Sequence, residues 1–346
     1  MQDQKQDFSF TGTGAEYFRI WIVNLLLTIV TLGIYSAWAK VRRMQYFSRN
    51  TWVNGSSFDY HGTPTAILKG RLLAVGMFAA YNIALKTVPM LGLGIALLIA
   101  AVMPILLVKS FRFRAYNTSY RGLRFGFFGS VKEAYMKFLA LPILTLLSLY
   151  LLAPFTHQRI KAYQHNNSRF GQTSFEFRAG VGGFYKTYFL AFLLFTAVSG
   201  VLFFTAYKLT QGMMTPGTGM KNKKEILMMV MAAYALIIVA GLLIVPFFQA
   251  RLQNLIWNNT SLGAHRFAST LSARGMTWII LTNFIGIILT LGLFKPFADT
   301  RMARYRLAHM TMLPEGDLDA FVAGEQQNDG ATGTETAEMF DVDIAF

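Results

Sequence analysis

Long apolar segments are the feature that most constrains the fold of this chain of 346 residues. Crossing the hydrocarbon core of a bilayer takes ~20 apolar residues in a helix. We predict seven hydrophobic spans, at residues 18–39, 72–86, 90–108, 136–155, 188–207, 226–248 and 276–297. Charged residues make up only 14% of the chain, against about a quarter in soluble proteins. The sequence therefore predicts a polytopic helical membrane protein.

An internal repeat runs through the chain. Four segments share the same order of residues. A basic residue comes first, and an aromatic residue follows it in most copies. Next come Asn with Thr or Ser, then Gly, and finally Phe. The Asn residues of these segments are Asn50, Asn117, Asn167 and Asn259. A gapless match of Asn24–Tyr46 to Asn283–Tyr305 links the two ends of the chain. We predict a membrane domain at 1–312 with about five repeats, at 8–57, 58–124, 125–174, 175–266 and 267–312.

The polar parts of the repeat favour short β-hairpins. Asn54-Gly55 is typical of a type I′ turn, because both residues tolerate positive φ. In Phe58-Asp59-Tyr60 the alternation places both rings on one face of a strand, and Phe8-Ser9-Phe10 resembles this pattern. The hairpins are either separate loops or parts of a small membrane-associated sheet. The expected fold class is mainly α: a polytopic helical membrane protein with internal repeats and short β-hairpins between the helices.

The charge of the chain is divided between two regions. The net charge is +15, but the predicted C-terminal tail at 313–346 holds nine acidic and no basic side chains, which leaves +24 on the rest. Because the basic residues flank apolar segments, they indicate binding to anionic lipid headgroups and the positive-inside bias, not nucleic-acid binding. The candidate headgroup contacts are Arg42, Arg43, Arg112, Arg159, Arg251, Arg301 and Arg304. Ordinary interfacial anchoring is the alternative for these arginines, and the acidic tail could dock on them.

The number of spans conflicts with this charge pattern. If repeats one, three and five hold one span each and the others two, the aromatic strands lie on both sides of the membrane. Yet basic residues flank every one of these strands, which places them all in the cytoplasm. Breaks at Leu32-Gly33 and Leu291-Gly292 into re-entrant helix pairs would remove the conflict, although Lys40 and Arg42 would then hold the second limb at the interface. We leave this open and favour a cytoplasmic C-terminus.

Motifs for catalysis and metal binding are missing from the sequence. The chain has no cysteine, and its five histidines form no HExxH-type pair. No Gly-x-Ser-x-Gly motif or Walker-type loop occurs. The N-terminus lacks the apolar core of a cleavable signal peptide. We expect no enzymatic activity, no metal and no cofactor.

Uncharged polar residues inside the spans are the remaining site candidates. Asn24, Asn82 and Asn283 stand out, and Asn24 and Asn283 are equivalent in the repeat. They either form interhelical hydrogen bonds or line a polar cavity between the first and last repeats. Two functions stay open. One is a cavity or passage for a lipid or small solute, and the other is a scaffold whose basic, aromatic cytoplasmic face binds anionic lipids or partner proteins.

Several segments resemble the YjgN-like family of bacterial inner-membrane proteins. They are residues 10–18, 24–35 with Trp38-Ala39, 257–261, and 341–344. The resemblance covers almost the whole chain and implies a multipass location in the bacterial inner membrane. It implies no activity and no catalytic residues, because the function of the family is unknown.

Overall fold

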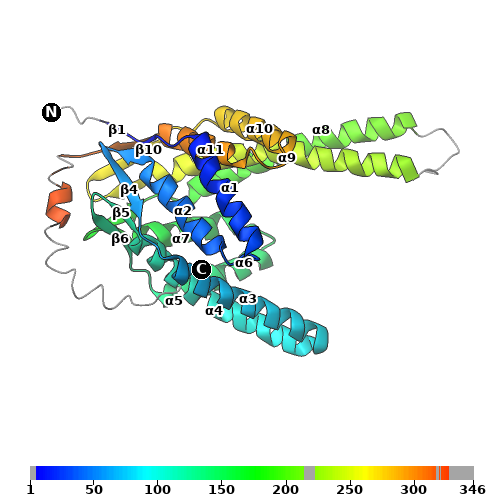
Figure 1. Ribbon diagram of the computed structural model, residues 1–346. Helices are drawn as coiled ribbons and strands as arrows, with labels where there is room; N and C mark the ends of the chain where they lie inside the picture. Colours follow the sequence, from blue (N-terminus) through cyan, green and yellow to red (C-terminus); the bar gives the residue numbers. More distant parts are fainter. Residues whose placement is uncertain (1–4, 214–222, 317–318, 320, 327–346) are drawn as a thin grey trace.

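The computed structural model describes residues 5–213, 223–316, 319 and 321–326. Its strands are β1 (Gln6–Asp7), β2 (Ser9–Phe10), β3 (Thr51–Val53), β4 (Ser56–Tyr60), β5 (Thr118–Tyr120), β6 (Leu123–Phe127), β7 (Ser168–Phe170), β8 (Thr173–Phe177), β9 (Thr260–Leu262), β10 (His265–Ser269) and β11 (Met310–Leu313). Its helices are α1 (Gly14–Val30), α2 (Ser36–Arg49), α3 (Pro64–Thr87), α4 (Pro89–Tyr116), α5 (Val131–Tyr135), the π-helical turn η1 (Met136–Ala140), α6 (Leu141–Leu147), α7 (Ala153–Asn166), α8 (Val181–Met213), α9 (Lys223–Trp257), α10 (Ala273–Leu289) and α11 (Lys295–Ala308). The strands gather on one side of the molecule, and the helices extend from the other (Figure 1).

The strands form one antiparallel sheet that closes on itself. Its 11 strands follow the order β1-β11-β10-β9-β8-β7-β6-β5-β4-β3-β2. β1 pairs with β11 at one edge, and β2 pairs with β3 at the other. Only Phe8 separates β1 from β2, and its N–H donates to the Met310 carbonyl at 3.0 Å. One short N-terminal segment therefore joins both edges and makes the sheet barrel-like.

The expected fold class is wrong on this point. The expected class is mainly α, a polytopic helical protein with short β-hairpins between the helices, whereas the hairpins pair with one another through β4–β5, β6–β7 and β8–β9 into one sheet of 11 strands. A single hairpin is at best marginally stable and exposes two unpaired edges. Pairing all of them in one sheet satisfies those edges. Of the two interpretations left open, the strands do form a sheet, with the shape of a barrel, and its association with the membrane stays a prediction.

Tight turns connect the strands at one end of the barrel, which we call the turn end. Asn54 and Gly55 have φ values of 45° and 70°, and Arg121 and Gly122 have values of 50° and 81°. Positive φ at both central residues is the requirement of a type I′ turn. The hairpin turn predicted at Asn54-Gly55 is confirmed.

Helical hairpins connect the strands at the opposite end, which we call the helix end. In the described part of the chain they are α1–α2, α3–α4, α5–α7, α8–α9 and α10–α11. Each leaves the barrel and returns to it at the same end, so no strand lies beyond a helical hairpin. This arrangement removes the conflict between the number of spans and the basic residues beside every strand.

Three of the predicted spans are broken. The backbone is left-handed at Leu32-Gly33 (φ 50° and 91°), at Leu149-Tyr150 (51° and 65°) and at Leu291-Gly292 (50° and 95°), which ends each right-handed helix. Among the described residues four helical segments are long and apolar enough to cross a membrane: Pro64–Thr87, Pro89–Tyr116, Val181–Thr205 and Ile237–Trp257. The predicted spans 18–39, 136–155 and 276–297 are therefore not continuous helices, and two of the breaks lie at the Leu-Gly positions named from the sequence.

The Asn residues of the repeat end helices and do not form the β-turns. Each side-chain amide donates to the carbonyl four residues earlier at 2.8 Å: Asn50 to Tyr46, Asn117 to Phe113, Asn167 to Tyr163 and Asn259 to Leu255. His309 occupies the same position after α11 and contacts the Tyr305 carbonyl through Nδ1 at 2.8 Å. These side chains satisfy carbonyls that a helix C-terminus leaves unpaired. They fix where each helix turns into a strand.

Candidate ligand-binding cavity

An apolar cavity of about 410 Å³ lies inside the barrel. Its wall includes Phe8, Phe58, Phe125, Phe170, Phe175 and Phe267. Small-molecule sites in proteins span roughly 300–1,000 Å³ and are mostly apolar. An empty apolar cavity of ~150 Å³ already binds benzene. The size and lining of this cavity therefore suit an apolar guest.

A row of phenylalanines forms one side of the cavity. Phe58 of β4, Phe125 of β6, Phe175 of β8 and Phe267 of β10 have successive ring centroids 6.2, 6.3 and 6.2 Å apart, with nearly parallel rings. The strands that carry them are second neighbours, whose backbones lie ~9.5 Å apart in a sheet. The rings are closer to one another than the backbones, so they converge on the concave face. The row makes a continuous aromatic wall.

In β4, β6 and β8 a second aromatic residue packs against helices instead, whereas β10 has Ser269 at that position. Tyr60 packs in a cluster with residues of α2 and α3, and Phe127 in a cluster with residues of α4 and α7. Phe177 packs with residues of α8 and α9. The first aromatic position therefore shapes the cavity, and the second joins the barrel to the helices.

The C-terminal segment, residues 319 and 321–326, covers the turn end. Phe321 and Val322 form part of the cavity wall. Glu325 is only 7% exposed and accepts hydrogen bonds from the Gln172 N–H, from the Thr173 N–H at 3.3 Å and from the Thr173 hydroxyl at 2.7 Å. This part of the tail docks on hairpin turns and not on the arginines at the helix exits. Residues 327–346 and Leu318 lie outside the described residues.

A second cavity, of about 440 Å³, adjoins the barrel cavity at the helix end. The two share Phe58, Thr118, Phe125, Phe175 and Trp257. The rest of its wall includes polar and basic side chains of α4 and α7, namely Arg114, Lys161, Gln164 and His165. No acidic residue is among the residues that line it. We call this second cavity the basic neck.

A third cavity, of about 590 Å³, lies between α6, α7 and α8. It shares Lys161 and Gln164 with the basic neck. Its wall also holds Tyr150, at the break between α6 and α7, and His157, whose Nδ1 lies 2.9 Å from the Tyr188 hydroxyl. The three cavities follow one another from the helix surface to the inside of the barrel.

The electrostatics of the basic neck centre on Lys161. Burial lowers the pKa of Lys161, and repulsion from Arg114 lowers it further. The Lys161 ammonium donates to Gln164 Oε1 at 3.1 Å. Burial also lowers the pKa of His165 to about 4, with Lys161 as the second cause. Among the described residues neither Lys161 nor Arg114 takes part in an ion pair.

The three asparagines predicted inside the spans lie away from these cavities. Asn283 is buried, donates to the Ala298 carbonyl at 3.3 Å and accepts from Arg301 at 2.8 Å. Asn24 is equally buried, and its Oδ1 has no hydrogen-bond partner among the described residues. Asn82 donates to the Phe78 carbonyl of its own helix at 2.8 Å. None of the three lines a cavity described above.

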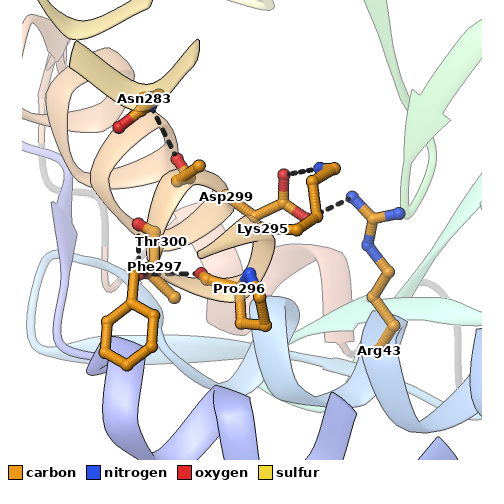
Figure 2. Close-up of polar contacts among 8 residues, drawn as sticks. Arg43, Asn283, Lys295, Pro296, Phe297, Asp299 and Thr300 are labelled. Carbon is orange, nitrogen blue, oxygen red and sulfur yellow. Dashed lines mark hydrogen bonds and ion pairs between the residues drawn. The ribbon is translucent and has the colours of Figure 1, made fainter. Parts of the chain in front are cut away.

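Asn283 belongs to a polar junction between the last and first helical hairpins. Figure 2 shows Asn283 beside α11, where the Asp299 carboxylate contacts both Lys295 and Arg43. The Arg43–Asp299 distance is 3.5 Å. The junction therefore ties α2 to α11 and α10 to α11, which fits the interhelical hydrogen-bond interpretation of Asn283.

The seven predicted headgroup arginines fall into two groups. Arg43, Arg112, Arg301 and Arg304 contact protein acceptors, namely Asp299, the Gly129 carbonyl, Asn283 with Thr282, and the Gly12 carbonyl. Arg42, Arg159 and Arg251 lie over the rings of Tyr35, Phe155 and Phe247. Arg42 also borders a hollow of about 460 Å³ together with Arg19 and Arg49. Headgroup binding stays a prediction, and the second group suits it better.

The sequence analysis missed Arg114, Lys161, His165 and Glu325. A partial signal exists, because Arg114 and Gln164 both stand three residues before a helix-ending Asn. That spacing places a side chain near the helix end. It does not show that α4 and α7 meet beside the opening of a barrel.

Comparison with known proteins agrees with the family resemblance. The sequence profile of a family described as "Bacterial protein of unknown function (DUF898)" matches residues 5–339. A protein named "Inner membrane protein YjgN" from Salmonella typhimurium is 30% identical over 90% of this chain and 89% of its own length. A protein of the same name from Escherichia coli O157:H7 is 27% identical over 92% of this chain and 91% of its own length. No solved structure matches. The chain belongs to this family of bacterial proteins of unknown function, DUF898.

Proposed function

We propose that this protein resides in the bacterial inner membrane and binds the hydrocarbon chain of a lipid inside its barrel. The apolar barrel cavity of about 410 Å³ carries this proposal. It adjoins the basic neck, which in turn shares Lys161 and Gln164 with the cavity between α6, α7 and α8. The names of the relatives and the four long apolar segments support the membrane location.

In the proposed arrangement α3–α4 and α8–α9 cross the membrane, and the three broken hairpins enter its interface. Their broken tips expose Leu32 at 94%, Leu149 at 85% and Leu291 at 95%. Exposed leucines at the tips of three hairpins are unfavourable in water and favourable in lipid. The barrel then lies outside the hydrocarbon, next to the membrane surface.

We place the barrel on the cytoplasmic side. The end of α3–α4 away from the barrel carries Lys86 as its single basic residue, whereas the barrel end carries Lys69, Arg71, Lys109, Arg112 and Arg114. Positive charge near span ends favours the cytoplasm. The two ends of α8–α9 differ less in positive charge. The sequence between and beside the two helices, at the end away from the barrel, carries Lys208, Lys221, Lys223 and Lys224.

The absence of cysteine allows a direct test of this orientation. We expect Val88→Cys, between α3 and α4, to react with a membrane-impermeant maleimide added to spheroplasts. Ser174→Cys, on β8, should react only in inverted membrane vesicles. Labelling of both residues from the same side would contradict the two-span arrangement of α3–α4.

We propose binding and not catalysis, since the sequence lacks the motifs of known catalytic sites. The alternative function, a scaffold that binds anionic lipids or partner proteins, draws support from Arg42, Arg159 and Arg251, which lie on aromatic rings near helix exits. A scaffold needs no open barrel. The occupancy of the barrel therefore separates the two functions.

The test of barrel binding is photo-crosslinking with a diazirine-bearing fatty acid on the purified full chain in lipid nanodiscs. We expect adducts on peptides that contain β6, β8 and β10. Leu262→Trp, which fills the cavity wall from β9, should remove these adducts, and Val53→Phe should do so from β3. Leu147→Trp, at an exposed position on α6, is the matched control and should leave them unchanged. Adducts confined to the membrane-facing helices in the unaltered chain would refute the proposal.

A further inference from the structure

The cavities form a path with one basic constriction. Lys161 and Gln164 line both the outer cavity, between α6, α7 and α8, and the basic neck. The neck in turn shares four aromatic residues with the barrel cavity: Phe58, Phe125, Phe175 and Trp257. A molecule that reaches the barrel from the helix side therefore passes Lys161.

The positive charge in the neck has no acidic neighbour among the described residues. No Asp or Glu lines the neck or the outer cavity. Lys161 is half-buried on α7, and Arg114 stands at the rim on α4. A partly buried cation without an acidic partner is costly, and its attraction to an anion exceeds that of the same pair in water. The neck is thus built to receive negative charge.

The surroundings of this charge change sharply in polarity over a short distance. On the barrel side the phenylalanine row offers only apolar surface to a ligand. On the outer side Gln164, His157 and Tyr188 supply polar groups. A ligand that satisfies both sides has one charged head and one hydrocarbon chain.

We infer that Lys161 and Arg114 bind the anionic head of a single-chain amphiphile whose hydrocarbon chain lies in the barrel. This inference rests on the proposed function and names the class of ligand. The volume of the barrel cavity lies in the lower half of the range of small-molecule sites, which favours one chain over the two of a diacyl lipid. A carboxylate or a phosphate monoester supplies the same anionic chemistry, so the head is either that of a fatty acid or that of lysophosphatidic acid.

Competition against the barrel adducts of the diazirine fatty acid tests the inference. The competitors are a fatty acid, lysophosphatidic acid and the uncharged fatty alcohol of equal chain length. We expect Lys161→Met to weaken competition by both anions roughly tenfold or more, because the substitution removes one charged hydrogen bond. Competition by the alcohol should stay the same. The anion that competes more strongly in the unaltered protein identifies the head group of the ligand.

Two further variants keep the result interpretable. Lys161→Arg retains the charge and should restore most of the anion competition. Lys132→Gln removes an exposed basic residue of α5, in the same helical hairpin, that does not line the neck and should change nothing. Equal loss for anions and alcohol, or no loss in Lys161→Met, would overturn the inference while leaving barrel binding in place. Absence of barrel adducts in the unaltered chain would instead overturn the proposed function.

Discussion

At the turn end of the barrel acidic side chains meet their partners within the protein, whereas at the helix end basic side chains face a cavity. Glu325 is held by the backbone and hydroxyl of the β7–β8 hairpin, and Asp319 pairs with Arg121. Lys161 and Arg114 have no acidic partner among the described residues. A partly buried charge without a partner is costly, whereas the charges at the turn end are paired within the protein. This difference supports the proposed entry of a ligand at the helix end.

The largest expected effect concerns the two aromatic positions of β6. Phe127 is 4% exposed and packs at the helix end among α4 and α7, so Phe127→Ala should cost about 3–5 kcal/mol of unfolding free energy. Phe125→Ala should cost less, because one face of its ring already borders a cavity. Thermal unfolding in detergent measures both. Equal losses would contradict the division between cavity-forming and helix-anchoring positions.

A smaller effect is expected at the turn end from Glu325→Ala. The change leaves the Gln172 and Thr173 donors unpaired, which should cost about 1–3 kcal/mol and release the C-terminal segment. Limited proteolysis should then cut this segment faster. Glu176→Ala, an exposed carboxylate of the same barrel, should leave the cleavage rate unchanged.

A backbone variant checks the same contact. Gly171 has φ of 56°, and a Cβ at this position would overlap the Glu325 carboxylate. Gly171→Ala should therefore release the segment as Glu325→Ala does. Gly55→Ala has a comparable φ of 70° with open space around the new Cβ, and it should not. Release by both glycine variants would trace the effect to turn strain, not to Glu325.

The next effect is a dependence of stability on pH at the helix end. The pKa of His165 is lowered from 6.5 to about 4 in the folded protein. Between these values the unfolded chain binds more protons, so stability falls as the pH is lowered through this window. From pH 7 to pH 5 the loss from His165 alone should be about 2 kcal/mol. His165→Gln should reduce the dependence of the melting temperature without removing it, because burial also lowers the pKa of His157 to about 4. An unchanged slope would show that His165 does not contribute.

The smallest effects are expected in the helix layer away from both ends. Asn283→Leu removes the acceptor of Arg301 and should cost on the order of 0.6 kcal/mol or slightly more. Asn24→Leu should cost less, because the Asn24 Oδ1 has no partner among the described residues. Both variants should retain the barrel adducts of the photoactivatable fatty acid. Loss of these adducts in either variant would favour the polar cavity between the first and last repeats over the barrel.

Local features could be predicted from the sequence because their causes are local. Asn54-Gly55 forms a turn since both residues accept positive φ. At the Leu-Gly pairs, 32–33 and 291–292, the glycine supplies the left-handed conformation that ends the helix. The alternation in Phe58-Asp59-Tyr60 correctly puts both rings on one face. It does not show that one ring enters a cavity while the other meets a helix, since that depends on the distance of each from the helix end.

The spans were miscounted because hydropathy does not detect these breaks. The stretch 136–155 has the composition of a membrane helix, yet it contains a π-helical turn and the left-handed pair Leu149-Tyr150. The candidate site was missed for a different reason. Arg114 and Lys161 are distant in the sequence, and only the β6–β7 pairing brings the ends of their helices together at the basic neck.

The sequence by itself determined the long apolar segments, the family, the hairpin turns and the helix ends, since each of these depends on composition or on neighbouring residues. The tertiary structure decided the closure of the sheet, the cavity and the neck. Closure pairs Gln6 with Met312 and Ser9 with Trp52, contacts that no local pattern specifies. They form because the barrel satisfies the hydrogen bonds of both free edges at once.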